Sequence, residues 1–413
     1  MLINKISHSL VSFFLLLWSY FYFIVPIFGY TGFIWDFSYV KFIESVILVI
    51  ITDYVLPRRC DKPSDFLLNI HYLLPILPML VLYAGSNQSR IFMYSVILFF
   101  YMIIVLRNFN FPTLKVRKFN QNFLKNLLIF ICFLYLGLLF YYNRFDLNFN
   151  FFNVYLYRIE YSEKLPFFFN YLSPLVSKVF LPIAIFLCLS YKNRFLFVAL
   201  LVCAFLIFGY TQHKATFFYP LFVITLYAIV KSKNIIYQLK FFYLLLVIAC
   251  LILFTFNDDI ILYISSILYR RFLLVPADLN FQYFEYFTSY PNVYWAKNFF
   301  TFGLIDYPYD IPTANIMGEF VSGKYQNYAN TGWIGSGFMH FHYIGLFIYS
   351  IIISYIMSIL DALSKQINTP LVIAFTTIPV LTMFVSSDLP TTLLTHGLII
   401  SIIITMCISN NEK

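Results

Sequence analysis

Arg270 and Arg271 are the adjacent cations of this sequence that are best suited to bind a diphosphate group. A guanidinium gives bidentate, charge-assisted hydrogen bonds to phosphate oxygens and stays charged at any working pH. The alternative is that these side chains contact lipid headgroups or a nearby acid such as Asp278. Lys214, in the tight turn 210–215, can hold a phosphate as a point charge, although a lysine at a membrane interface is ordinary without any ligand.

Proton removal from an attacking hydroxyl requires a base, and the second half of the chain offers several candidates. They are Asp258, Asp259, Asp278, Glu285, His340 and His342. An unperturbed histidine has a pKa well matched to this role near neutral pH. The alternative for each carboxylate is a solvated loop residue without a chemical role.

The composition decides what kind of scaffold holds these residues. The 413 residues are 61% hydrophobic and only 11% charged, whereas about 25% is usual in a soluble domain. Apolar runs of about 17–22 residues recur along the whole chain, and each can cross the hydrocarbon core of a bilayer as a helix. The ten-residue alternating segments of a β-barrel are absent. The sequence therefore predicts an all-α polytopic membrane protein, with residues 1–413 as a single integral membrane domain.

About twelve transmembrane helices are predicted from the apolar runs. They cover residues 10–30, 38–56, 66–84, 91–106, 122–142, 173–190, 195–210, 215–230, 241–256, 340–360, 370–386 and 394–409. The run 38–56 carries Lys41, Glu44 and Asp53, and charges inside a span usually face protein or water. An alternative for Lys41 and Asp53 is that they extend towards opposite membrane surfaces.

The placement of lysine and arginine predicts the orientation in the membrane. With the N-terminus inside, 16 of the 27 basic residues fall in segments predicted to be cytoplasmic, and most of the others lie in two long external loops. This bias towards short cytoplasmic segments follows the positive-inside rule and predicts both termini in the cytoplasm. The same placement excludes nucleic acid as the partner that explains the formal charge of +9.

The external loops, residues 143–172 and 257–339, are the largest segments predicted outside the membrane. The larger one lies between the ninth and tenth spans. All predicted cytoplasmic segments are short and lack the Gly-x-x-x-x-Gly-Lys pattern of a nucleotide site. The sequence also lacks metal-ligand spacing, so we expect chemistry on the external side without a metal or cofactor.

The larger loop and the helix after it resemble the bacterial oligosaccharide repeat-unit polymerases, the Wzy-type O-antigen and capsule polymerases. The resemblance rests on the Tyr-rich segment 271–287, on Ala329-Asn330-Thr331-Gly332-Trp333-Ile334-Gly335-Ser336-Gly337, and on Gly345 in an apolar helix. Trp333 stands where phenylalanine is common in that family. The turn with Lys214 is loosely similar to a Gly-x-Lys turn of the family. The fold class resembles the GT-C-like membrane glycosyltransferases.

The resemblance implies that an undecaprenyl-diphosphate-linked glycan donates its chain to another lipid-linked repeat unit, to build O-antigen or capsular polysaccharide. It implies a bacterial cytoplasmic (inner) membrane location, contact with membrane lipid, and a polysaccharide chain-length regulator as a partner. Arg270, Arg271, Lys214 and Arg158 are the predicted diphosphate-binding residues. The predicted sugar-binding residues are Tyr283, Tyr286, Trp295, Asn330 and Trp333. As the base, His340 ranks above Asp278 and His342.

Two other classes of membrane protein remain open at this point. A flippase for lipid-linked oligosaccharides also has about twelve spans, but it would have short external loops and two similar halves. An O-antigen ligase or another lipid-linked glycosyltransferase would share the external loop. The long loop 257–339 and the dissimilar halves favour the polymerase over the flippase.

Overall fold

The computed structural model describes residues 3–109, 118–150, 157, 165–256, 258–296, 298, 301–324 and 327–409. Over these ranges the regular structure is helical, apart from an isolated bridge between Phe119 and Ile408, so the predicted all-α class is confirmed. The chain forms two compact units. Unit 1 comprises residues 1–110, 234–359 and 381–390, and unit 2 comprises residues 111–233, 360–380 and 391–413.

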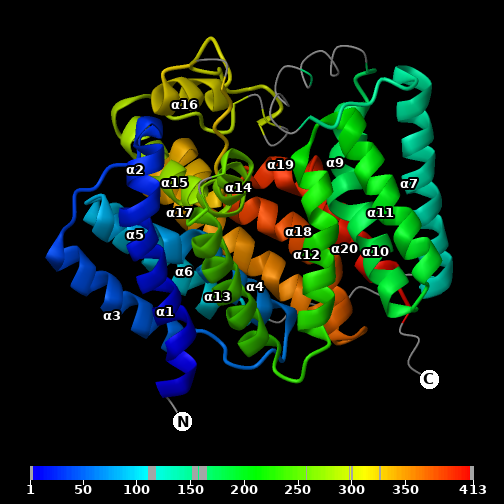
Figure 1. The fold of residues 1–413 in the computed structure, drawn as a ribbon, viewed down its shortest axis with the longest axis horizontal. Coiled ribbons are helices and arrows are strands. Elements are labelled where there is room, and N and C mark those ends of the chain that lie inside the picture. The colour runs from blue at the N-terminus through cyan, green and yellow to red at the C-terminus, as the bar shows by residue number, and fades with distance from the viewer. Residues whose placement is uncertain are drawn as a thin grey trace. The chain divides into compact units, whose positions relative to one another are not determined.

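Figure 1 shows the order of the helices along the chain. Unit 1 holds α1 (Ile3–Ser19), α2 (Val25–Phe28), α3 (Tyr39–Val55), α4 (Pro63–His71), α5 (Leu77–Gly85), α6 (Arg90–Leu106), α13 (Ile235–Phe254), α14 (Asp259–Ser265), α15 (Val275–Ser289), α16 (Thr313–Ser322) and most of α17 (Trp333–Ser364). Unit 2 holds α7 (Gln121–Asn143), α9 (Phe169–Leu175), α10 (Leu181–Ser190), α11 (Arg194–Thr211), α12 (Lys214–Val230), most of α18 (Thr369–Val385) and α20 (Leu398–Cys407). The short helix α19 (Leu389–Leu394) begins in unit 1.

Nine helical segments in the described part of the chain are long and apolar enough to cross a membrane, and the chain is a multi-pass membrane protein on this basis. Eight of them coincide with predicted spans. Three other predicted spans form the shorter apolar helices α6, α12 and α18. The ninth segment, Asp259–Ser289, falls inside the predicted external loop 257–339, so the first third of that loop is helical.

The continuous segment Pro63–Gly85, formed by α4 and α5, is the central helix of unit 1. Its apolar window is buried throughout, and α1, α3, α13 and α15 all contact it. A helix that is apolar on every side is stable only when neighbours cover every side. This explains why its sequence shows no polar stripe.

In the described part of the chain, four π-helical turns interrupt the long helices, and each ends two residues before a proline. A proline lacks the N–H group and its ring collides with the carbonyl group four residues earlier, so a wider turn at that position relieves the collision. In all four cases the residue four positions before the proline lies within the π-helical turn. The pairs are Pro26 with Tyr20–Ile24, Pro78 with Tyr72–Ile76, Pro182 with Val176–Phe180, and Pro276 with Ser266–Leu274.

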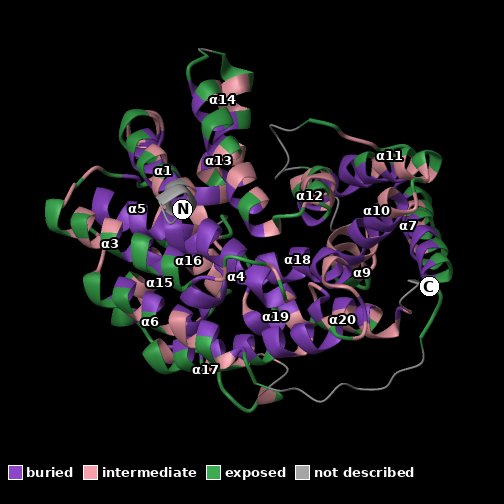
Figure 2. Ribbon diagram, turned by 90° about the horizontal axis from the view of Figure 1, so that it is seen from below, coloured by how far each residue is buried: buried purple, intermediate pink, exposed green. Residues whose placement is uncertain are grey.

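The segment α14–α15, residues 259–289, crosses its neighbours in unit 1. Figure 1 draws α14 and α15 close together, whereas Figure 2, turned by 90°, draws them far apart. The segment therefore extends along the line of sight of Figure 1, across α1 and α13, which Figure 1 shows lengthwise. This course carries Arg270 past α2 and Asn280 past α5.

The charged residues of α3, in the predicted span 38–56, are paired inside unit 1. Lys41 donates to the carbonyl oxygens of Asn87 and Gln88, and the Asp53 carboxylate accepts from the buried Lys240 ammonium. Only 4% of Asp53 is exposed, so its carboxylate is held by protein groups. The pairing explains how this helix keeps its charges among apolar neighbours.

Helix α17 is broken in its first third. Phe341 (φ −147°, ψ 29°) and His342 (φ 50°, ψ −134°) leave the helical conformation, which separates residues 333–340 from the long helix that follows. The two parts fold back on each other, because Gly337 and Gly345 bring their backbones into direct contact. Gly345 has no room for a side chain. The sequence prediction placed one span at 340–360 and did not anticipate this break.

We expect Gly345→Ala to destabilise unit 1 by about 3 kcal/mol or more, the upper end of the cost of overpacking. A Cβ at Gly345 would overlap the carbonyl oxygen of Gly337, and a backbone atom cannot turn away as a side chain does. Thermal unfolding of the purified protein in detergent measures the loss. Gly137→Ala is the control, since open space surrounds that helical glycine and alanine is the better helix former there. Equal unfolding midpoints for the two variants would contradict the contact.

Candidate functional site

The two segments that carry the family resemblance lie against each other in unit 1. The Asn280 side-chain oxygen accepts from the Thr331 hydroxyl and from the backbone N–H of Gly335, each at 2.9 Å. The Tyr283 hydroxyl donates to the carbonyl oxygen of Ala329 at 2.7 Å. Helix α15 therefore fixes the turn 329–335 at the start of α17. Asn280 is buried, so these bonds are protected from water.

A loop after α15 closes the broken end of α17. Helix ends leave carbonyl groups without partners, and an interruption inside a buried helix does the same. The Asn292 amide donates to the carbonyl oxygens of Phe338 and Met339 at 3.1 and 3.0 Å, and the Val293 N–H donates to Met339 at 3.1 Å. Hydrogen bonds from this loop therefore satisfy the carbonyl groups that the break leaves open.

Next to this break lies the His340 cluster, which comprises His340, Asp388, Tyr349 and Trp295. His340 Nε2 lies 2.9 Å from Asp388 Oδ2, and the Tyr349 hydroxyl donates to Asp388 Oδ1 at 2.7 Å. The Trp295 indole N–H donates to the Tyr349 hydroxyl at 2.8 Å, and its backbone N–H donates to His340 Nδ1 at 3.0 Å. The cluster joins the loop 292–296, α17 and the residue before α19.

Both ring nitrogens of His340 are occupied by these bonds. Because Nδ1 accepts from a backbone N–H, the ring proton is on Nε2 and points to Asp388. His340 was the first-ranked base in the sequence prediction, but in this structure it has no lone pair available to a substrate. Its geometry instead suits a residue that positions the loop around Trp295.

Asp388 was not among the predicted site residues. It precedes α19, and it is held by His340, Tyr349 and the backbone N–H of Leu389. Burial alone would raise the pKa of the Asp388 carboxyl, but the interaction with His340 and the hydrogen bond from Tyr349 hold this pKa below its ordinary value. The carboxylate is thus ionised and fixed at neutral pH.

His342 occupies the strained position of the helix break. A positive φ is uncommon for a residue with a side chain, and it persists only where the surroundings enforce it. His342 Nε2 lies 2.8 Å from the carbonyl oxygen of Phe287. A carbonyl can only accept, so Nε2 carries the proton and Nδ1 keeps its lone pair. The side chain is partly exposed, and its chemistry at Nδ1 fits a proton acceptor better than that of His340.

An aromatic patch lies at the far end of α15 from Arg270. It comprises Tyr286, Tyr290, Tyr307, Tyr309 and Phe320. The rings of Tyr286 and Tyr290 stack at 4.3 Å, and Phe320 meets Tyr286 at 5.3 Å. Tyr290 is 52% exposed and Phe320 is 41% exposed. Exposed rings with polar tips offer a flat apolar face together with hydroxyl groups, which suits the C–H face of a sugar.

The predicted sugar-binding residues divide by burial. Trp333 is completely buried with its indole N–H donating to His71, and Tyr283 is buried with its hydroxyl on Ala329. Both rings pack inside unit 1 in this structure, and their sugar-binding roles stay predictions. Tyr286, Trp295 and Asn330 are at least partly exposed, so their predicted roles remain open.

The predicted diphosphate-binding residues belong to different units of the chain or lie outside the described residues. The Arg270 guanidinium lies 4.7 Å above the ring of Phe28 and its Nε donates to Ser266, while Arg271 is exposed. Lys214 begins α12 in unit 2, and Arg158 lies outside the described residues. The Asp278 side chain is buried in α15.

The described ranges contain no group of three or more His, Cys, Asp or Glu side chains that could hold a metal ion. Comparison of the chain with protein-family models, with curated protein sequences and with solved structures finds no match.

Proposed function

We propose that this protein polymerises lipid-diphosphate-linked oligosaccharide repeat units on the external face of the membrane. The proposal is supported chiefly by one observation. The segments 271–287 and 329–337, which resemble the repeat-unit polymerases, are bonded to each other through Asn280 and Tyr283 beside the broken helix α17. Discontinuous helices in membrane proteins commonly form substrate sites, because their backbone groups can face a cavity.

The residues around the break supply the parts that such a reaction needs. The aromatic patch offers exposed rings to a glycan, and His342 lies next to it through its bond to the carbonyl oxygen of Phe287. Phe287 in turn meets Tyr309 of the patch at 6.4 Å between ring centroids. We therefore propose His342 as the general base, in place of the higher-ranked His340 and Asp278.

The reaction itself is a displacement at the anomeric carbon of the donor glycan. The hydroxyl oxygen of the acceptor sugar forms a bond to this carbon, and the bond from the carbon to the diphosphate oxygen breaks. Nδ1 of His342 takes the hydroxyl proton. The lipid diphosphate leaves with the bonding electron pair. The alternatives are a flippase for the same lipid-linked glycan and an O-antigen ligase.

Deletion of the gene in its host, followed by complementation, tests the proposal. Surface glycolipid separated on a silver-stained gel is expected to show the lipid core with a single repeat unit, and the full ladder on complementation. This pattern arises when transfer and flipping persist while elongation fails. A bare core without any repeat unit would point to a flippase or a ligase, and an unchanged ladder would remove the protein from this pathway.

A further inference from the structure

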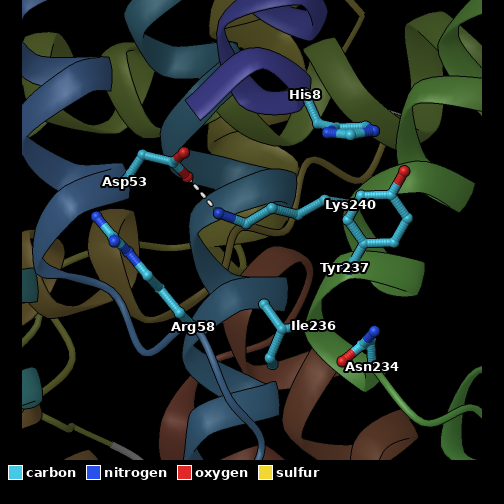
Figure 3. A pocket seen from close by; sticks show the side chains of 7 residues that line it. All are labelled: His8, Asp53, Arg58, Asn234, Ile236, Tyr237 and Lys240. Carbon is cyan, nitrogen blue, oxygen red and sulfur yellow. Dashed lines mark hydrogen bonds and ion pairs between the residues drawn. The ribbon is translucent and has the colours of Figure 1, made fainter. Parts of the chain in front are cut away.

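A pocket of about 120 Å³ lies at the opposite end of α1 from the candidate site. Figure 3 shows its lining residues, which are His8, Asp53, Arg58, Asn234, Ile236, Tyr237 and Lys240. His8 and Phe28 are twenty residues apart on the continuous helical segment α1–α2, a rise of about 30 Å. Because Arg270 stacks on Phe28, the pocket is about one bilayer core away from that arginine.

The pocket has a charged floor and an open rim. Lys240 and Asp53 form an ion pair at the floor, where they are 8% and 4% exposed, and the Ser9 hydroxyl donates to Asp53 at 2.8 Å. Arg58, Asn234 and Tyr237 are exposed and line the rim. In Figure 3 the Arg58 side chain reaches from its loop towards Asp53. A ligand can therefore enter from the surface and reach buried charge.

The balance of charge in this pocket favours an anion. Lys240 and Arg58 carry two positive charges, and Asp53 carries one negative charge, so one positive charge is not compensated by the lining residues. Arginine binds phosphate through two parallel hydrogen bonds, and lysine binds it as a point charge. The imidazole of His8 and the amide of Asn234 offer further donors. A cavity of about 120 Å³ has room for several waters, and so for one phosphate-sized group.

The segments that form the pocket are also predicted to lie on the same side of the membrane. His8, Arg58 and the residues 234–240 come from three segments that the distribution of basic residues predicts on the cytoplasmic side. The structure brings them to one place in unit 1. An anionic lipid headgroup in the same leaflet would meet the exposed rim directly, since juxtamembrane basic residues attract such headgroups.

We propose that this pocket binds a phosphate group, either the headgroup of a membrane lipid or free phosphate, at the end of unit 1 that is predicted to be cytoplasmic. The phosphate oxygens contact Arg58 at the rim and Lys240 at the floor, and Asp53 holds the Lys240 ammonium in place. This site is separate from the candidate active site, and the phosphate-binding proposal does not depend on the proposed function.

The test is native mass spectrometry of the purified full chain in detergent, titrated with inorganic phosphate, with phosphatidic acid, and with phosphatidylcholine of the same acyl chains. We expect phosphatidic acid to bind more tightly than phosphatidylcholine. Arg58→Gln should weaken this binding about tenfold, because a charge-assisted bidentate contact is lost. Arg59→Gln is the matched control, since Arg59 is the exposed neighbour with the same charge and does not line the pocket.

The two sources of phosphate give different results. Competition by inorganic phosphate would assign the site to a free phosphate group, and binding of phosphatidic acid without such competition would assign it to a lipid headgroup. Equal binding of both lipids without any binding of inorganic phosphate would overturn the proposal. Equal losses in the Arg58→Gln and Arg59→Gln variants would also overturn it, because they would indicate general attraction by surface charge.

Discussion

Replacing His342 with alanine is expected to leave the lipid-linked repeat units unextended. A positioned base contributes about 10²- to 10⁴-fold to a reaction of this type. The imidazole that remains at the break, His340, has both ring nitrogens in hydrogen bonds. The gel of surface glycolipid should then show the core with a single repeat unit, as in the gene deletion. Membrane levels of the variant, measured by immunoblotting, should equal those of the unaltered protein.

His396→Ala provides the matched control for this experiment. His396 also lies between two helical segments, α19 and α20, but it belongs to unit 2 and has no part in the proposed chemistry. The control is expected to restore the full ladder. A normal ladder from His342→Ala at equal protein levels would exclude His342 as the base and would return attention to Asp278.

Lys240→Met is expected to cost unit 1 about 3–5 kcal/mol of stability, the usual result of leaving a buried charge without its partner. Asp53 is almost fully buried, and after the substitution it keeps the Ser9 hydroxyl but loses the ammonium that compensates its charge. Thermal unfolding of the purified protein in detergent, followed by size-exclusion chromatography, should show a midpoint lower by several degrees.

The double variant Asp53→Asn with Lys240→Met separates this explanation from a simple packing defect. When both charges are removed, the remaining groups can pack without an uncompensated ion, and most of the lost stability should return. Lys233→Met, at an exposed lysine just before the same helix, should have almost no effect. If the double variant unfolds as early as Lys240→Met, the stability of the region does not depend on the ion pair.

The lengths of the apolar runs predicted most of the fold because a run of that length has few other stable conformations in a membrane. The predicted spans 122–142 and 195–210 each differ from α7 and α11 by one residue at both ends. The segment 259–289 was predicted as loop because charged residues such as Arg270 and Asp278 interrupt its apolar pattern. Burial of one side against α5 and α13 stabilises it as a helix, and this depends on neighbours that the local sequence does not reveal.

The candidate site was predictable only in part. The sequence placed the segments 271–287 and 329–337 in one loop, and the structure joins them. It could not show that Trp333 and Tyr283 face inward, because an aromatic side chain suits a core and a binding surface equally. Asp388 carried a usable signal, since it is the one carboxylate between residues 369 and 409 and an acid among apolar helices usually has a partner.

The division of unit 1 into three stretches of chain has a consequence for its biogenesis. Residues 1–110 leave the ribosome first, but they pack against residues 234–359, and Asp388 emerges later still. During synthesis the histidine of α17 therefore lacks its carboxylate until residues 360–380 of unit 2 and then residue 388 have been made. Chains that stall before residue 388 would retain an incomplete His340 cluster, and such late-closing contacts make a membrane protein a natural substrate for quality-control proteases.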